Sequence, residues 1–210
     1  MKRAPLFFIL ILTACAAQPS TPSAALPIVS VYASPATEPW LDDVYACATE
    51  VSVVIRLSAS QSVADIRLRL GEPPHLTTPA YQIGEEDILV VTHLQNPLRE
   101  LTADEARQLF AGGEENVEVW VYASGAEIQE LFEREVMRGT RIHSSARLAL
   151  HPQQILDTLN TRSNVVGLLP RRWTNKTIRE VFALRNVPVL TITTDEPQSA
   201  VKELIACLQK

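Results

Sequence analysis

The sequence of 210 residues has few cysteines, few aromatic side chains and no excess of basic charge. Its three cysteines form no Cys-x-x-Cys pair, and its four histidines are too scattered to form a metal-binding cluster with them. The net charge of −5 is not typical of a nucleic-acid-binding chain. We therefore expect no bound metal, no cofactor and no nucleic-acid partner.

Motifs of catalysis are also missing, because no Gly-x-Ser-x-Gly, phosphate-loop or His-Glu-x-x-His pattern occurs. Residues 199–202 (SAVK) match the Ser-x-x-Lys of penicillin-recognising enzymes, whose other motifs are absent. A surface serine and lysine on the last helix explain that match equally well. A hydrolase is thus the weakest interpretation, and we predict that the chain is not an enzyme.

The N-terminus carries the most specific pattern. Two basic residues precede the apolar run PLFFILILTA, which is too short to span a bilayer. Residues 12–15 (LTAC) resemble a bacterial lipobox, which implies cleavage of a signal peptide over 1–14 and lipidation of Cys15. An ordinary signal peptide with an incidental cysteine is the alternative. Residues 15–27, rich in Ala, Ser, Thr and Pro, predict a tether, so we expect a lipid-anchored protein outside the cytoplasm.

The remaining two cysteines, Cys47 and Cys207, leave two alternatives open. Outside the cytoplasm a disulfide between them is permitted. Two separate buried thiols fit the sequence as well, because a large distance in sequence says little about distance in space.

Apolar residues make up 46% of the chain, which is enough for a sizeable core. Strand-like and helix-like segments alternate without an internal repeat, and this favours an α/β fold with largely parallel strands. We expect a long loop over 71–86 between them. The strands are expected at 28–34, 51–58, 66–70, 87–94, 117–122, 165–169 and 187–194, and the helices at about 39–50, 101–113, 124–138, 151–164 and 196–210.

Two helix starts have the spacing of a capping box, in which a serine or threonine and a glutamate three residues later cap each other's backbone. These pairs are Thr102 with Glu105 and Ser124 with Glu127. At the second pair a plain structural cap and a ligand-binding role are both open.

The order of the segments resembles the phosphate-type periplasmic solute-binding protein family. Residues 96–113 (NPLRELTADEARQLFAGG) resemble the family's Asn-Pro…Leu-Thr…Glu…Phe…Gly signature. Residues 123–133 (ASGAEIQELFE) resemble its Ser-Gly-Thr…Phe junction, and residues 164–169 (NVVGLL) resemble its Ile-Gly-Tyr strand. The likeness extends over most of residues 28–210.

This resemblance implies a two-lobed, type II periplasmic-binding-protein-like fold of reduced size, with mixed, largely parallel sheets flanked by helices. The first lobe would comprise 28–93 plus 187–210 and the second 94–170, with a return crossover over 171–186. A ligand would bind in the cleft between the lobes, beyond the carboxyl ends of the strands.

The resemblance also implies the ligand contacts. They fall on three segments and comprise Ser34, Thr37, Arg69, Ser124 and Gly125. Ala126 stands where the family has a threonine, and Arg69 where it has small residues. The carboxylate of Glu127 would repel an anionic ligand here unless Arg69 offsets it.

Two functions therefore remain. The first is an ABC-transporter-type substrate-binding lipoprotein, a monomer that captures a small, phosphate-like anionic solute and delivers it to an ABC permease. The alternative is a degenerate binding-protein-like domain that acts as a sensor or surface interaction lipoprotein without a transport role. The short chain favours the alternative, because the segment between 51–58 and 66–70 has almost no room for the usual helix.

Overall fold

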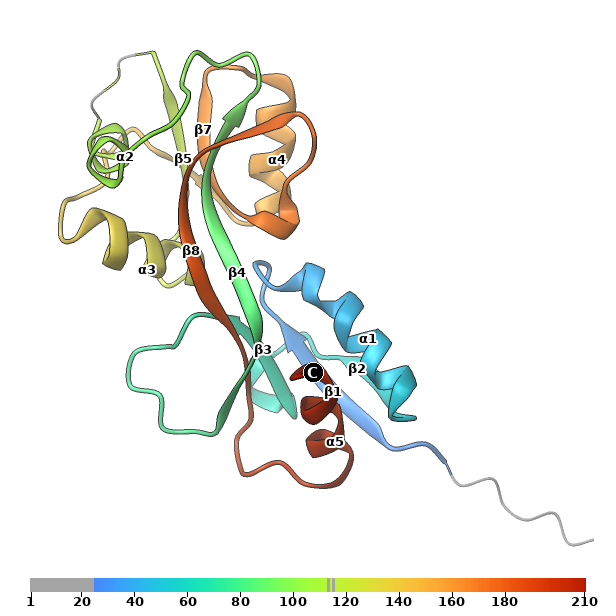
Figure 1. The fold of residues 1–210 in the computed structure, drawn as a ribbon. Coiled ribbons are helices and arrows are strands. Elements are labelled where there is room, and N and C mark those ends of the chain that lie inside the picture. The colour runs from blue at the N-terminus through green and yellow to red at the C-terminus, as the bar shows by residue number, and fades with distance from the viewer. Residues whose placement is uncertain (1–24, 113, 115) are drawn as a thin grey trace, which may run out of the picture.

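The computed structural model describes residues 25–112, 114 and 116–210 (Figure 1). The signal peptide over 1–14, Cys15 and the tether as far as residue 24 lie outside the described residues, so they stay predictions. Within the described part of the chain, no helix is long and apolar enough to cross a membrane.

Strands and helices alternate, which confirms the α/β class. The strands of the described residues are β1 Ile28–Ala33, β2 Val54–Leu57, β3 Ile66–Leu70, β4 Ala80–His93, β5 Glu118–Tyr122, β6 Arg147–Ala149, β7 Val165–Pro170 and β8 Ile178–Ile192. The α-helices are α1 Leu41–Glu50, α2 Ala103–Phe110, α3 Glu127–Phe132, α4 Pro152–Thr161 and α5 Ser199–Leu208. Short turns of other helix types are η1 Glu38–Trp40, η2 Gln61–Val63, η3 Glu133–Met137 and η4 Arg171–Trp173.

The strands form one hydrogen-bonded sheet in the order β2-β1-β3-β8-β4-β7-β5-β6. The pairings β1–β2, β1–β3, β5–β6 and β5–β7 are parallel. The antiparallel pairings β3–β8, β4–β7 and β4–β8 all involve β4 or β8. The sheet is therefore mixed, with parallel pairing at both ends and an antiparallel centre.

The molecule nevertheless has two lobes, and β4 and β8 run through both (Figure 1). The first lobe contains β1–β3, α1 and α5, and the second contains β5–β7 and α2–α4. Residues 189–192 of β8 pair with β3 in the first lobe, whereas residues 88–92 of β4 pair with β7 in the second. The expectation of separate sheets is corrected, because these two long strands join the lobes without a break in hydrogen bonding.

The expected loop over 71–86 is wrong in its second part. Residues 80–86 belong to β4 and pair with β8 from Ile192 back to Val187. Polar residues and irregular register hide this strand in the sequence, since the pairing shifts between Gln82 and Gly84 and again between Glu86 and Ile88.

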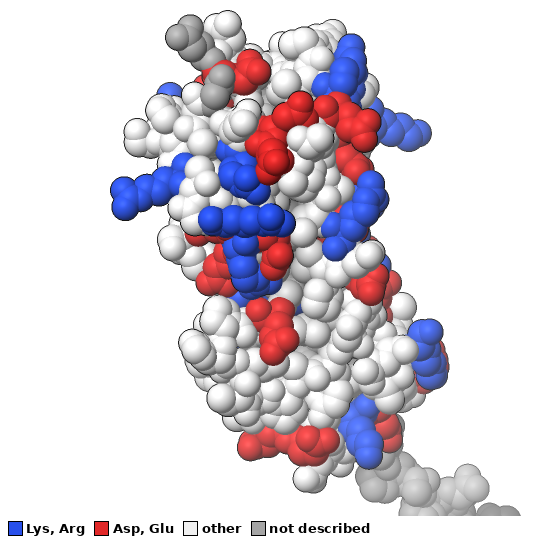
Figure 2. Space-filling view, turned by 60° about the vertical axis from the view of Figure 1, so that its left-hand side comes forward, with Lys and Arg blue, Asp and Glu red and all other residues white. Residues whose placement is uncertain are grey.

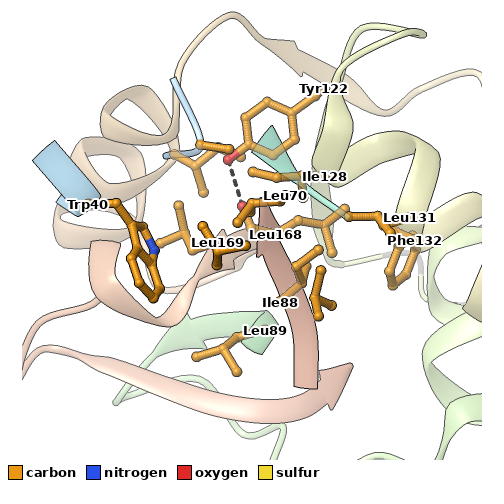
Figure 3. Packing of buried hydrophobic residues seen from close by; sticks show 14 of the residues in the cluster. Trp40, Leu70, Ile88, Leu89, Tyr122, Ile128, Leu131, Phe132, Leu168 and Leu169 are labelled. Atoms are coloured by element: carbon orange, nitrogen blue, oxygen red, sulfur yellow. Dashed lines mark hydrogen bonds between the residues drawn. The ribbon is translucent and has the colours of Figure 1, made fainter. Parts of the chain in front are cut away.

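The hydrophobic core continues from one lobe into the other along β4 and β7. Ile88, Leu89, Leu168 and Leu169 are fully buried where these strands pair (Figure 3). The indole of Trp40 lies so close to the β4 backbone that a Cβ atom on Gly84 would be 2.4 Å from it. The junction between the lobes is therefore packed as tightly as a domain interior.

A disulfide joins Cys47 in α1 to Cys207 in α5, with 5.7 Å between the Cα atoms. The structure thus decides between the two alternatives that the sequence left open. The bond ties the last helix to the first, across a sequence separation of 160 residues.

Candidate functional site

The start of α3 differs from the expected capping box of Ser124 and Glu127. The N-cap of α3 is Ala126, which has no side-chain capping hydrogen bond, and Glu127 is the first helical residue. Ala126 N–H donates to the Ala123 carbonyl at 3.1 Å, so a backbone turn with Gly125 at φ +90° precedes the helix. The Glu127 side chain is consequently not engaged in capping. The box of Thr102 and Glu105 at α2 is confirmed.

The carboxylate of Glu127 instead crosses from the second lobe to the first. Its Oε2 accepts hydrogen bonds from the Leu70 backbone N–H at 3.0 Å and from the Ser34 hydroxyl at 2.9 Å. Close packing of α3 on the end of β3 makes this reach feasible. Gly71, at φ +69°, leaves room for Leu131, whose Cδ2 would lie 2.7 Å from a Cβ atom at that position.

Two buried hydroxyls stand beside this carboxylate in the loop after β1. The Ser34 and Thr37 hydroxyl oxygens lie 3.1 Å apart, and the Thr37 N–H donates to the Ser34 carbonyl at 2.9 Å. This turn fixes the Ser34 hydroxyl against Glu127. The sequence prediction that Ser34 and Thr37 lie together at the cleft agrees with these positions.

Arg69 supplies the positive charge of the site. Its Nη2 lies 2.6 Å from Oε2 of Glu130, and its Nη1 lies 3.8 Å from Oε1 of Glu127. Its buried Nε has no hydrogen-bond partner among the described residues. Arg69 in the first lobe thus faces two carboxylates of the second lobe, which repel each other and share one cation.

Burial dominates the protonation of Glu127. Removal from water raises the pKa of its carboxyl above the usual 4.5, and the Leu70 N–H, the Arg69 charge and the Ser34 hydroxyl oppose that rise. The remaining shift is upward. The carboxylate is therefore costly to keep charged although three donors face it.

A cavity of about 260 Å³ lies between the lobes next to these groups. Its walls include Ser34, Arg69, Gly125 and Glu127, and its apolar side is formed by Pro35, Ala36, Ile128, Leu150 and Pro152. Of the five predicted contacts, Ser34, Arg69 and Gly125 line this cavity and Thr37 lies directly behind it. Ser124 is exposed in the turn before α3 and is not part of the cavity wall.

The lobes also touch on a second side, where His151 at the N-cap of α4 lies 3.1 Å from the Glu38 carboxylate. Nearby, Arg172 pairs with Asp43 at 2.7 Å and stacks over the Trp40 ring at 3.8 Å. Sequence reasoning missed this set of contacts, since its partners lie more than 100 residues apart.

Charges of both signs alternate on the surface. Figure 2 shows basic and acidic side chains interspersed over the upper lobe and a mostly uncharged lower lobe on the face that it displays. This face thus offers no extended basic surface for nucleic acid.

Comparison with known proteins places this geometry. No family model matches the sequence, and no curated protein matches it. Among solved structures, a putative phosphate ABC transporter substrate-binding protein with bound phosphate from Clostridium perfringens superimposes with a TM-score of 0.76. It is 15% identical, over 86% of this chain and 92% of that one. The chain has the fold of a type II periplasmic binding protein.

Further neighbours share this type II fold and have different functions. An ABC-type phosphate transport receptor from Vibrio cholerae gives a TM-score of 0.62 at 14% identity, over 87% of this chain and 93% of that one. The reduced OxyR regulatory domain from Pseudomonas aeruginosa gives 0.64 at 11% identity, over 88% and 98%. The type II fold of this chain is therefore compatible with both solute capture and regulation.

Proposed function

We propose that the chain is an extracytoplasmic, lipid-anchored protein that uses a type II binding-protein fold as a sensor or surface interaction domain. In this proposal it carries no free phosphate to a permease and performs no covalent chemistry. The single observation that supports the proposal is the position of the Glu127 carboxylate. It accepts the Ser34 and Leu70 hydrogen bonds that a bound oxyanion would need.

Electrostatics gives this observation its weight. An oxyanion placed beside these donors would lie about 4 Å from the Glu127 carboxylate. Two like charges at that distance repel by about 4 kcal/mol at an effective dielectric constant near 20. Such a cost lowers affinity about a thousandfold. Arg69 offsets little of it, because its closest contact is to Glu130.

The phosphate-carrier alternative also has an observation in its favour, since two of the fold neighbours named above are phosphate transport proteins. At 14–15% identity, that likeness concerns the fold. Under this alternative the chain would bind phosphate in its native form and would pair with an ABC permease.

Calorimetric titration of the chain with inorganic phosphate and with sulfate at pH 7.5 separates the two functions. We expect no saturable heat for the native chain, because Glu127 is charged and occupies the donors. Glu130→Gln serves as a matched control, since it removes one acid of the same helix and leaves Glu127 in place. Saturable phosphate binding by the native chain would overturn the proposal and favour the carrier.

A further inference from the structure

One face of the sheet in the first lobe has no helix over it. On β3 the buried Ile66, Leu68 and Leu70 alternate with the half-buried Arg67 and Arg69, so the two arginines share the opposite face.

The register continues this face onto the neighbouring strands. Tyr32 of β1 and Ile192 of β8 pair with Arg67 from its two sides. An arginine is thus flanked by an aromatic and an aliphatic side chain.

A loop covers this face in place of a helix. The connection from β2 to β3 contains only the three-residue turn η2, whereas residues 71–79 after β3 extend over the sheet (Figure 1). Beneath them lies a cavity of about 230 Å³, lined by Tyr32, Arg67, His75, Thr77, Thr78 and Ile192 among others. This chamber, called the loop chamber below, shares Tyr32, Gln61, Arg69 and Glu127 with the interlobe cavity.

Arg67 differs from its neighbour Arg69 in having no partner. Within the described part of the chain, no carboxylate lies within 4.0 Å of the Arg67 guanidinium, whereas Arg69 contacts both Glu127 and Glu130. A half-buried cation without a counter-ion is unfavourable, and an anionic ligand would relieve that cost. Its guanidinium also has the planar fork that binds a carboxylate through two hydrogen bonds.

The rest of the loop chamber defines the kind of anion. The Thr77 and Thr78 hydroxyls add polar groups, and the Tyr32 ring and Ile192 add an apolar wall for an organic body. Glu127 at the shared boundary would repel a second negative charge. The chamber is too small for a drug-sized ligand and opens toward the interlobe cavity.

We propose that the loop chamber binds a small organic monocarboxylate, with Arg67 as its counter-ion. This inference rests on the proposed function and supplies the ligand class that a sensor of this fold would detect. It assigns recognition to Arg67, Thr77 and Thr78 on the first lobe, and it leaves Glu127 as the group that excludes multiply charged oxyanions.

Thermal unfolding of the full chain in detergent, followed by tryptophan fluorescence at constant ionic strength, tests the inference. The probes are benzoate, pyruvate and 4-methyl-2-oxopentanoate at 10 mM, with benzamide as the uncharged control. A Kd of about 0.1 mM would raise the Tm by about 5–11 °C, because the ligand binds only the folded state. We expect at least one carboxylate to give such a rise and benzamide to give none.

Variants locate the response. Arg67→Gln should weaken carboxylate binding at least tenfold, and Arg67→Lys should restore part of it. Arg56→Gln, an exposed arginine on β2 of the same sheet, is the matched control and should respond as the native chain does. The unliganded Tm of each variant shows whether it is folded.

The outcomes separate this inference from the proposed function. A carboxylate response that survives Arg67→Gln, or silence of all three carboxylates, overturns the inference alone. A rise in Tm with inorganic phosphate in the native chain would instead contradict the proposed function.

Discussion

At the scale of the residue, Glu127 determines what the cleft can accept. Its carboxylate is buried, takes one backbone N–H and one hydroxyl from the other lobe, and has an arginine nearby. A neutral or absent side chain at this position would leave those donors unpaired and facing the cavity. Unpaired buried donors are costly, and an anion from solvent could satisfy them. The identity of this residue therefore separates a self-satisfied cleft from an anion-binding one.

The raised pKa of Glu127 predicts how stability depends on pH. Because the folded chain holds this proton at a pH where the unfolded chain has lost it, the Glu127 contribution to the free energy of unfolding decreases as pH rises. The window runs from the usual 4.5 up to the higher folded value. Urea unfolding of the native chain and of Glu127→Gln across this window should show the native chain gaining stability relative to the variant as pH falls. A difference that is constant with pH would contradict the assignment.

A second prediction at this scale concerns Gly84. A Cβ atom there would overlap the Trp40 indole at 2.4 Å, so Gly84→Ala should cost about 1–3 kcal/mol of unfolding free energy. The control Gln82→Ala changes an exposed side chain of the same strand and should stay within about 0.5 kcal/mol. Urea midpoints measure both, and equal midpoints for the two variants would show that the packing is not tight.

At the scale of the element, the helices and apolar strands could be predicted because their hydrophobic periodicity is local. The 80–86 part of β4 could not, because its residues are polar and its partner strand lies about 100 residues further along the chain. The role of Glu127 was hidden for a related reason. Its spacing to Ser124 suggested a cap, but its actual partner, the Leu70 N–H, is 57 residues away in sequence.

The disulfide between α1 and α5 gives a prediction for these elements. Replacement of Cys47 and Cys207 by serine should lower the free energy of unfolding by about 2–5 kcal/mol, because the bond closes a long loop in the unfolded chain. Denaturant unfolding with and without reductant measures the effect, and the serine variant should not respond to reductant. Two reactive thiols in the unfolded, unreduced native chain would contradict the bond.

At the scale of the whole molecule, two lobes share one sheet and touch on both sides of the cleft. Glu127 and Arg69 link them on one side, and His151 with Glu38 links them on the other. These contacts need no ligand to hold the lobes together. A binding-protein fold arranged in this way suits a sensor or an interaction domain more than a carrier that must open and close around phosphate.

The lipid anchor is also a property of the whole molecule. Expressed in a bacterium and fed an alkyne-labelled fatty acid, the native chain should incorporate the label, whereas Cys15→Ser should incorporate none. Cys47→Ser is the control, because it removes a cysteine outside the predicted lipobox. Equal labelling of native chain and Cys15→Ser would exclude Cys15 as the lipidated residue.

The central claim is that a carboxylate of the protein itself occupies the position of an anion. A crystal structure of the native chain grown at 100 mM phosphate and pH 7.5 tests it most directly. The account predicts the Glu127 carboxylate within about 3 Å of the Leu70 N–H and the Ser34 hydroxyl, with no phosphate on those donors. A phosphate ion bound there, with the Glu127 side chain turned away, would contradict it.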